Sequence, residues 1–230
     1  MSRIPGKRAT AVGVAVAVMG GLAVGVVPAL VGAETLSSKV EIVANLPKGA
    51  QPTKRNPVPV TVDVLMEWQR STNDNATTLQ KTTVLFPLGS VYNGAKLPKC
   101  TAAALNNNGV DGCPKGSVMG KGKALAFADT VRTTADITVV NGGADRVFFY
   151  TTMTNPAVVQ LPVEGKIRKL RGKWAYELVA EVPTDLQVVA GTPIVVYKME
   201  IKISNKKWLA LDRPPSGISV TNLLGPPRGS

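Results

Sequence analysis

The stretch VPVTVDVLMEW, residues 58–68, alternates apolar and polar side chains over most of its length. Its apolar side consists of Val58, Val60, Val62, Val64, Met66 and Trp68. Thr61, Asp63 and Glu67 fall on the other side. A period of two residues is typical of a β-strand with one buried and one solvent-facing face. The stretch therefore predicts a long strand that lays its apolar side against a second layer.

Two later stretches, 174–182 and 195–203, alternate in the same way. Their predicted buried sides are Trp174, Tyr176, Leu178, Ala180 and Val182 in the first, and Val195, Tyr197, Met199, Ile201 and Ile203 in the second. Shorter strands are expected at 40–46, 82–86, 117–127, 135–140, 146–153, 158–163 and 208–211. Turn signals between them are Asn141-Gly142-Gly143, Glu164-Gly165, Arg171-Gly172 and Ala190-Gly191-Thr192-Pro193.

About ten strands separated by turns predict an all-β fold. We expect an antiparallel β-sandwich, immunoglobulin-like or jelly-roll-like, in which two sheets pack their apolar faces together. A closed barrel would give a similar pattern. Uneven strand lengths and the long connections after Trp68 and Phe86 favour the sandwich.

The two cysteines, Cys100 and Cys113, are the only ones in the chain. A lone pair of this kind in a protein outside the cytoplasm predicts a disulfide. The intervening segment 101–105 is rich in alanine and favours a helical turn, with Thr101 as its N-cap and Gly109 at its end. We therefore expect one short helical turn that the disulfide ties to the strands on either side.

The first 33 residues resemble an export signal. Arg3, Lys7 and Arg8 form a basic start, residues 9–27 are apolar or small, and Val31-Gly32-Ala33 provides a cleavage site. The predicted organisation is a signal peptide at 1–33, a β-sandwich domain at 34–212 and a flexible Pro/Gly-rich tail at 213–230. The protein is then secreted or associated with the cell surface. The alternative is an uncleaved N-terminal membrane anchor, because the apolar segment is long enough to span a bilayer.

The composition excludes several kinds of chemistry. The chain has no histidine, so it has no Ser-His-Asp or Cys-His relay and lacks the commonest metal ligand. We expect no metal, no cofactor and no enzymatic activity. Its 15 acidic residues leave open a glycan-active hydrolase that works with a pair of carboxylates.

The formal net charge is +12, which favours contact with anionic partners. Positive side chains gather in one segment that runs into Trp174. This basic cluster consists of Lys166, Arg168, Lys169, Arg171 and Lys173. It predicts a binding site for an anionic cell-wall polymer or glycan, with nucleic acid as a less favoured partner. The alternative is a solvated basic turn with an inward-facing tryptophan. A second group of lysines, at positions 198, 202, 206 and 207, leads to Trp208.

The segment around the cysteines resembles a recurring class of exported actinobacterial proteins of unassigned function. The motifs that carry the resemblance are Leu97-Pro98-Lys99-Cys100, Gly112-Cys113-Pro114-Lys115-Gly116-Ser117 and Gly120-x-Gly122, together with the strand-like segment Leu178 to Pro183. The class has no established activity, so the resemblance implies export and a β-rich fold but no catalytic residue. The function expected from the sequence is a secreted, non-enzymatic binding or structural module of the cell envelope. A wall-associated structural protein without a specific ligand is a further alternative.

Overall fold

The computed structural model describes residues 12–16, 25–31, 34–68, 77–214 and 216–227. Its strands are β1 (Val12–Val16), β2 (Gly25–Val31), β3 (Glu34–Asn45), β4 (Val58–Trp68), β5 (Thr78–Pro87), β6 (Ser90–Tyr92), β7 (Val118–Ala128), β8 (Val131–Asn141), β9 (Arg146–Met153), β10 (Val159–Lys169), β11 (Trp174–Glu181), β12 (Val188–Val189), β13 (Thr192–Ile203), β14 (Leu209–Leu211) and β15 (Ile218–Gly225). The helices are α1 (Ala102–Asn108), α2 (Thr184–Gln187) and two short 3₁₀ helices, Gly94–Lys96 and Gly109–Gly112. The predicted all-β class is confirmed.

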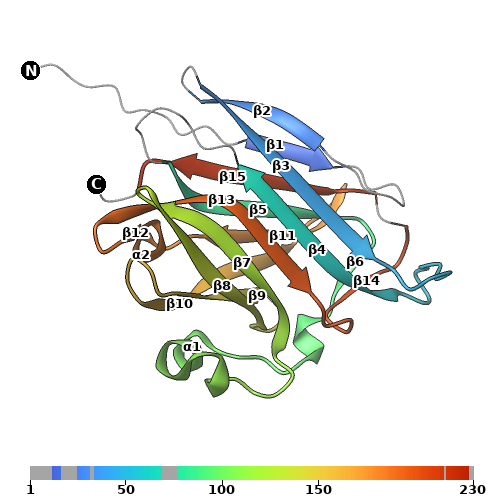
Figure 1. Cartoon of the computed structure of the whole chain (residues 1–230). Coiled ribbons are helices and arrows are strands. Elements are labelled where there is room, and N and C mark those ends of the chain that lie inside the picture. The colour runs from blue at the N-terminus through green and yellow to red at the C-terminus, as the bar shows by residue number, and fades with distance from the viewer. Residues whose placement is uncertain (1–11, 17–24, 32–33, 69–76, 215, 228–230) are drawn as a thin grey trace, which may run out of the picture.

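The strands form one continuous antiparallel sheet that folds back on itself (Figure 1). The hydrogen-bonded order is β15-β5-β11-β10-β9-β8-β7-β13-β4, with β3 on the far side of β4. One layer holds β3, β4, β13 and β7, the other holds β15, β5, β11 and β10, and β8 and β9 lie where the layers join. The strands from β7 to β11 follow each other as a meander. The predicted two-layer antiparallel sandwich is confirmed in this form.

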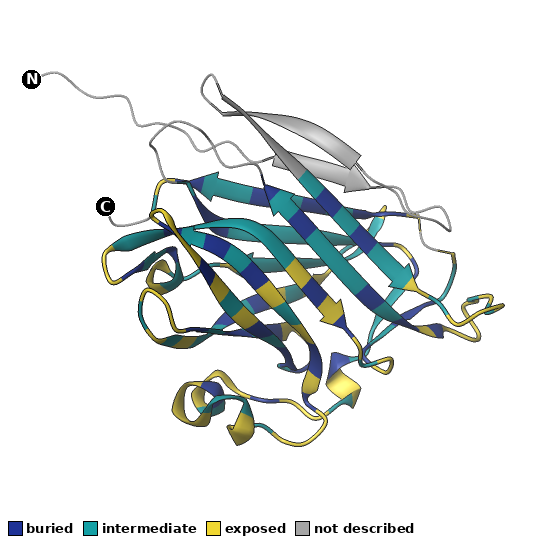
Figure 2. Ribbon diagram, in the orientation of Figure 1, coloured by how far each residue is buried: buried dark blue, intermediate teal, exposed yellow. Residues whose placement is uncertain are grey.

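The core lies between the two layers, as the alternation of burial along each strand shows (Figure 2). On β4, Val60, Val62, Met66 and Trp68 are buried as predicted. On β13 the prediction is right only for one half of the strand. A register shift between Val196 and Lys198 turns Ile194 and Val196, in place of Val195, toward the interior. The residue that a β-bulge adds reverses the alternation on one side of it.

Two predicted features are wrong. Glu164-Gly165 is not a turn but lies inside β10, where a Cβ on Gly165 would come within 2.8 Å of Leu178 Cδ1. The glycine therefore permits close packing rather than a change of direction. The flexible tail predicted from 213 onward includes Ile218–Gly225, which forms β15 and pairs with β5. Burial of Ile218 and Val220 in the core outweighs the proline and glycine content around them.

The predicted signal peptide falls partly outside the described residues, at 1–11, 17–24 and 32–33. Its described parts are strands: β1 pairs with β15, and β2 pairs with β3. In the part of the chain that the structure describes, no helix is long and apolar enough to span a membrane. Cleavage of this segment stays a prediction.

Candidate functional site

The basic cluster lies on the hairpin that joins β10 to β11. Val163 of β10 faces the interior, and side chains alternate along a strand. Lys166 and Arg168, three and five positions later, therefore project from the outer face of β10. Lys169 ends the strand. The backbone N–H of Leu170 donates to Ala175 O at 2.9 Å and closes the hairpin.

The turn of this hairpin carries the remaining cations of the cluster, Arg171 and Lys173, on either side of Gly172. Gly172 has a φ of 86°, a conformation that favours glycine. All five cationic side chains of the cluster are exposed. The predicted cluster is thus brought together on one hairpin, with its charges facing solvent.

Few of these charges are neutralised within the molecule. Arg168 forms an ion pair with Glu177, which lies opposite it on β11. Among the described residues, Lys166, Lys169 and Arg171 form no ion pair. The Lys173 ammonium lies 5.1 Å from the ring centroid of Trp174, within the range of a cation–π interaction. The hairpin therefore presents a surplus of positive charge to solvent.

The neighbouring strand β9 begins beside this cluster. Arg146 pairs across from Lys166, and its guanidinium donates to both carboxylate oxygens of Asp145 at 3.1 Å. That hydrogen bond to Arg146 holds the pKa of the Asp145 carboxyl below its usual range. Arg146 also contacts Glu164 at 3.5 Å. Two carboxylates, Asp145 and Glu164, therefore offset the single charge of Arg146 here, which leaves the hairpin as the positive part of this surface.

The two tryptophans that follow the basic segments differ in accessibility. Trp208 is buried, and its Nε1–H donates to Asn141 Oδ1 at 3.2 Å, so its ring is not available to stack on a ligand. Trp174 is half-buried beneath Lys173. The register between β11 and β5 shifts between Trp174 and Tyr176, which takes Trp174 out of the predicted buried phase.

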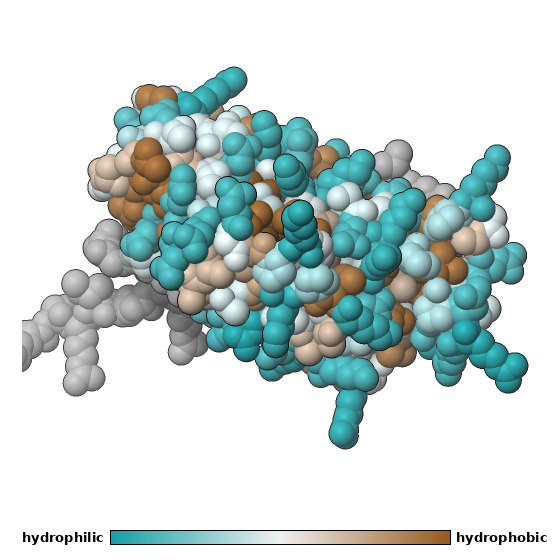
Figure 3. Space-filling view, turned by 90° about the horizontal axis from the view of Figure 1, so that it is seen from below, coloured by the Kyte–Doolittle hydropathy of each residue, from teal (hydrophilic) through white to brown (hydrophobic). Residues whose placement is uncertain are grey.

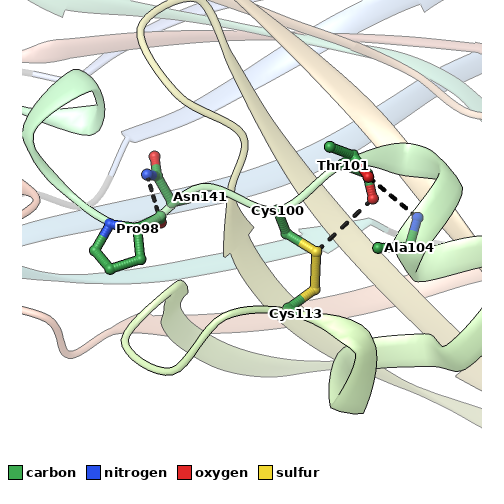
Figure 4. The surroundings of a disulfide bond; sticks show 6 residues. All are labelled: Pro98, Cys100, Thr101, Ala104, Cys113 and Asn141. Carbon is green, nitrogen blue, oxygen red and sulfur yellow. Dashed lines mark hydrogen bonds between the residues drawn. A yellow bond between two sulfur atoms is a disulfide. The ribbon is translucent and has the colours of Figure 1, made fainter.

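The disulfide loop, residues 100–113, packs on the outer side of β8 and β9, and Figure 4 shows its surroundings. Cys100 and Cys113 are bonded, and Thr101 Oγ1 accepts from Ala104 N at 3.2 Å as the N-cap of α1. Gly109 is the C-cap. Leu105 is fully buried against Val140, Phe148 and Tyr150. The predicted helical turn, its cap and its disulfide are all confirmed.

Asn141 joins this loop to the core and was not identified from the sequence. The side chain is fully buried, and its Nδ2 donates to Gly94 O at 2.9 Å and Pro98 O at 3.0 Å. Its backbone carbonyl accepts from Cys100 N at 2.8 Å. Its Oδ1 accepts a hydrogen bond from the indole Nε1–H of Trp208. Asn141 therefore satisfies polar groups from two distant segments at once, residues 94–100 and Trp208.

Several acidic residues of β3, β4, β8 and β13 line a groove on the outer face of the layer that holds β3, β4, β13 and β7. Its lining includes Glu41, Asp63, Asp136 and Glu200, interleaved with Lys121, Lys123 and Lys202. Lys123 pairs with Asp136 at 3.8 Å, and Lys202 pairs with Asp63 at 3.9 Å. Cross-strand ion pairs of this kind are typical of a solvated sheet face. The carboxylate-pair hydrolase stays a prediction.

A second hollow lies between the two layers. It is an apolar cavity of about 200 Å³ that both layers line, with Val62 and Ile201 on one side and Val84 and Leu178 on the other. At roughly 24 cal/mol per Å³, an empty cavity of this size would destabilise the fold by about 5 kcal/mol. An empty cavity of this size would therefore lower the stability of the fold substantially.

The face drawn in Figure 3 carries mainly hydrophilic side chains, with small separate hydrophobic areas between them. Among the described residues, no group of three His, Cys, Asp or Glu side chains is placed to hold a metal ion. No family model, curated protein or solved structure matches this chain. The resemblance to exported actinobacterial proteins therefore stays a prediction.

Proposed function

We propose that this chain is an exported, non-enzymatic β-sandwich module that binds anionic polymers of the cell envelope through the basic cluster. The observation that carries the proposal is the hairpin itself. It holds five exposed cations, of which Lys166, Lys169 and Arg171 have no anionic partner among the described residues. A surface of one charge sign attracts a polyanion and loses that attraction as salt screens it.

The disulfide supports the export part of the proposal. Disulfides persist in oxidising compartments and are rare where thiols are kept reduced. The Cys100–Cys113 bond closes the loop on which α1 sits. Export is tested by expressing the full chain in a secreting bacterial host and determining the N-terminal residue of the exported protein. A new N-terminus at Glu34 supports cleavage, whereas an intact N-terminus in the membrane fraction assigns this segment as an anchor.

Binding is tested by co-sedimentation of the protein with isolated bacterial cell walls at low and high salt. The test variant carries Lys166→Glu, Lys169→Glu and Arg171→Glu. The matched control reverses three exposed cations of the loop between β3 and β4, by Lys48→Glu, Lys54→Glu and Arg55→Glu. Both variants change the net charge equally, so only the location of the change differs.

We expect the hairpin variant to bind about tenfold more weakly and the control to bind nearly as the wild type, since local charges dominate a screened interaction. Equal loss in both variants would assign binding to net charge alone. Wild-type protein that fails to sediment with the walls at either salt would reject the binding function.

A further inference from the structure

The two layers of the sandwich enclose more space than their side chains fill. Protein interiors pack as densely as organic crystals and contain few voids larger than a water molecule. The cavity between the layers measures about 200 Å³. An engineered cavity of about 150 Å³ in another protein already accommodates benzene. The space in this core is therefore large enough for a ligand.

Small side chains at facing positions create the space. Ala124 and Ala126 on β7, Ala135 on β8 and Ala180 on β11 all line it. Each of these positions belongs to the inward-facing side of its strand, where larger apolar residues would close the gap. The alanines come from both layers, so the cavity lies between the layers and does not extend into one of them.

The lining follows the strands over most of their length. On β13 it extends from Ile194 to Ile203, through Val196, Met199 and Ile201. At about 3.3 Å per residue, this part of a strand spans about 30 Å. The space is therefore spread along the strands and not concentrated at one point. Its shape suits an extended chain and not a compact ring system.

The lining offers a ligand almost no hydrogen-bonding partner. Two threonines reach it, and both are already engaged: Thr82 Oγ1 lies 2.8 Å from Asn222 Oδ1, and Thr151 Oγ1 donates to Phe149 O at 3.2 Å. The indole N–H of Trp208 is directed to Asn141. Ordered water needs two to four polar partners, so water is a poor occupant as well. The chemistry favours a hydrocarbon.

We propose that the space between the two layers binds one unbranched hydrocarbon chain, such as the acyl chain of a fatty acid or lipid. The proposal is independent of polymer binding at the basic cluster, because the cavity lies on the inner faces of the strands. It rests on the volume, the elongated lining and the absence of available polar partners.

The test is isothermal titration of the full chain with dodecanoate and, separately, with 1-dodecanol. The test variant is Ala135→Leu, which adds a large side chain inside the cavity. The matched control is Thr134→Leu, the adjacent residue of β8, which is exposed on the opposite face. Ala180→Leu, on the other layer, provides a second filling variant. Circular dichroism establishes that each variant folds.

We expect wild type and Thr134→Leu to bind one equivalent of 1-dodecanol and to bind dodecanoate more weakly, because its carboxylate finds no partner in the lining. The filling variants should bind 1-dodecanol at least tenfold more weakly while keeping or raising Tm. Binding to dodecanoate without binding to 1-dodecanol would overturn the proposal, since the carboxylate and not the chain would then be recognised. Failure of the wild type to bind either ligand, or unchanged binding by folded filling variants, would overturn it equally.

Discussion

The disulfide loop and the basic cluster use their polar groups in opposite ways. In the loop, Thr101 Oγ1 accepts from Ala104 N, Cys100 is bonded to Cys113, and Cys100 N donates to Asn141 O, so these groups are satisfied within the protein. In the basic cluster, most cations face solvent, and one ion pair joins Arg168 to Glu177. Polar groups satisfied internally contribute to stability, whereas exposed charges remain available to a partner. Mutations in the two regions should therefore be detected by different measurements.

The largest effect on stability is expected from Asn141→Ala. The substitution leaves the carbonyl of the buried Gly94, the carbonyl of Pro98 and the indole N–H of Trp208 without this partner. We expect the free energy of unfolding to fall by about 4 kcal/mol. The measurement is urea denaturation with linear extrapolation. Asn107→Ala, an exposed change in α1, is the control and should stay within about 0.5 kcal/mol. A loss below 1 kcal/mol in Asn141→Ala would show that the network contributes little.

Removal of the disulfide should have the next largest effect. The double substitution Cys100→Ser with Cys113→Ser opens a loop whose ends are separated by 13 positions. The expected loss is about 3 kcal/mol, because the unfolded chain regains the entropy of the open loop. The check is the same denaturation experiment with and without dithiothreitol. Reductant should destabilise the wild type and leave the serine variant unchanged; an equal response of both would contradict the prediction.

Tyr92 provides a test that depends on pH. Burial raises the pKa of Tyr92 to about 12. In the unfolded chain a tyrosine ionises near pH 10, so between about pH 10 and 12 the unfolded state loses a proton that the folded state retains. The free energy of unfolding therefore falls as the pH rises through this range. Allowing for partial exposure, the fall is about 1 to 2 kcal/mol.

The Tyr92 prediction is checked by comparing slopes and not absolute stabilities. Tyr92→Phe loses the hydrogen bond to Gly143 O at every pH, but it should also lose this part of the pH dependence. Denaturation of both proteins at pH 9, 10, 11 and 12 gives the difference. Parallel curves for wild type and variant would show that the tyrosine ionises at the same pH in both states.

The smallest effect concerns the ion pair within the basic cluster. Arg168 is largely exposed, whereas the Glu177 side chain is only 13% exposed. A double-mutant cycle with Arg168→Gln and Glu177→Gln should give a coupling energy of less than about 1 kcal/mol. Stability that depends more strongly on this pair would make the cluster a structural element like the disulfide loop. A small coupling sharpens the contrast between the two regions.

Local patterns predicted the local structure well. Alternation located the strands from β3 to β14 except the short β6 and β12, and the cap at Thr101 and the end at Gly109 follow from residue types within one helical turn. Bulges were not predictable in this way. The shift between Val196 and Lys198 has no distinctive residue, and it reversed the predicted faces over half of β13.

Long-range contacts account for what the sequence did not show. Asn141 has the appearance of a turn residue before two glycines, and its partners at 94–98 and 208 are known only once the sheet is assembled. Strand β15 was hidden by its composition, although Ile218, Val220 and Asn222 alternate toward the interior. The basic cluster was found because its members are neighbours in sequence as well as on the hairpin.

Strand β15 also has a consequence for the order in which the protein can fold. Val84 of β5 pairs with Val220 of β15, which comes much later in the sequence. Until Ile218–Gly225 have been synthesised, β5 lacks one of its two neighbours, and contacts between such distant segments slow folding. A growing chain therefore exposes an unpaired strand edge, which is prone to pair with other chains. Completion of the sheet must wait until β15 has been synthesised, so most of the strands are made long before the fold can close.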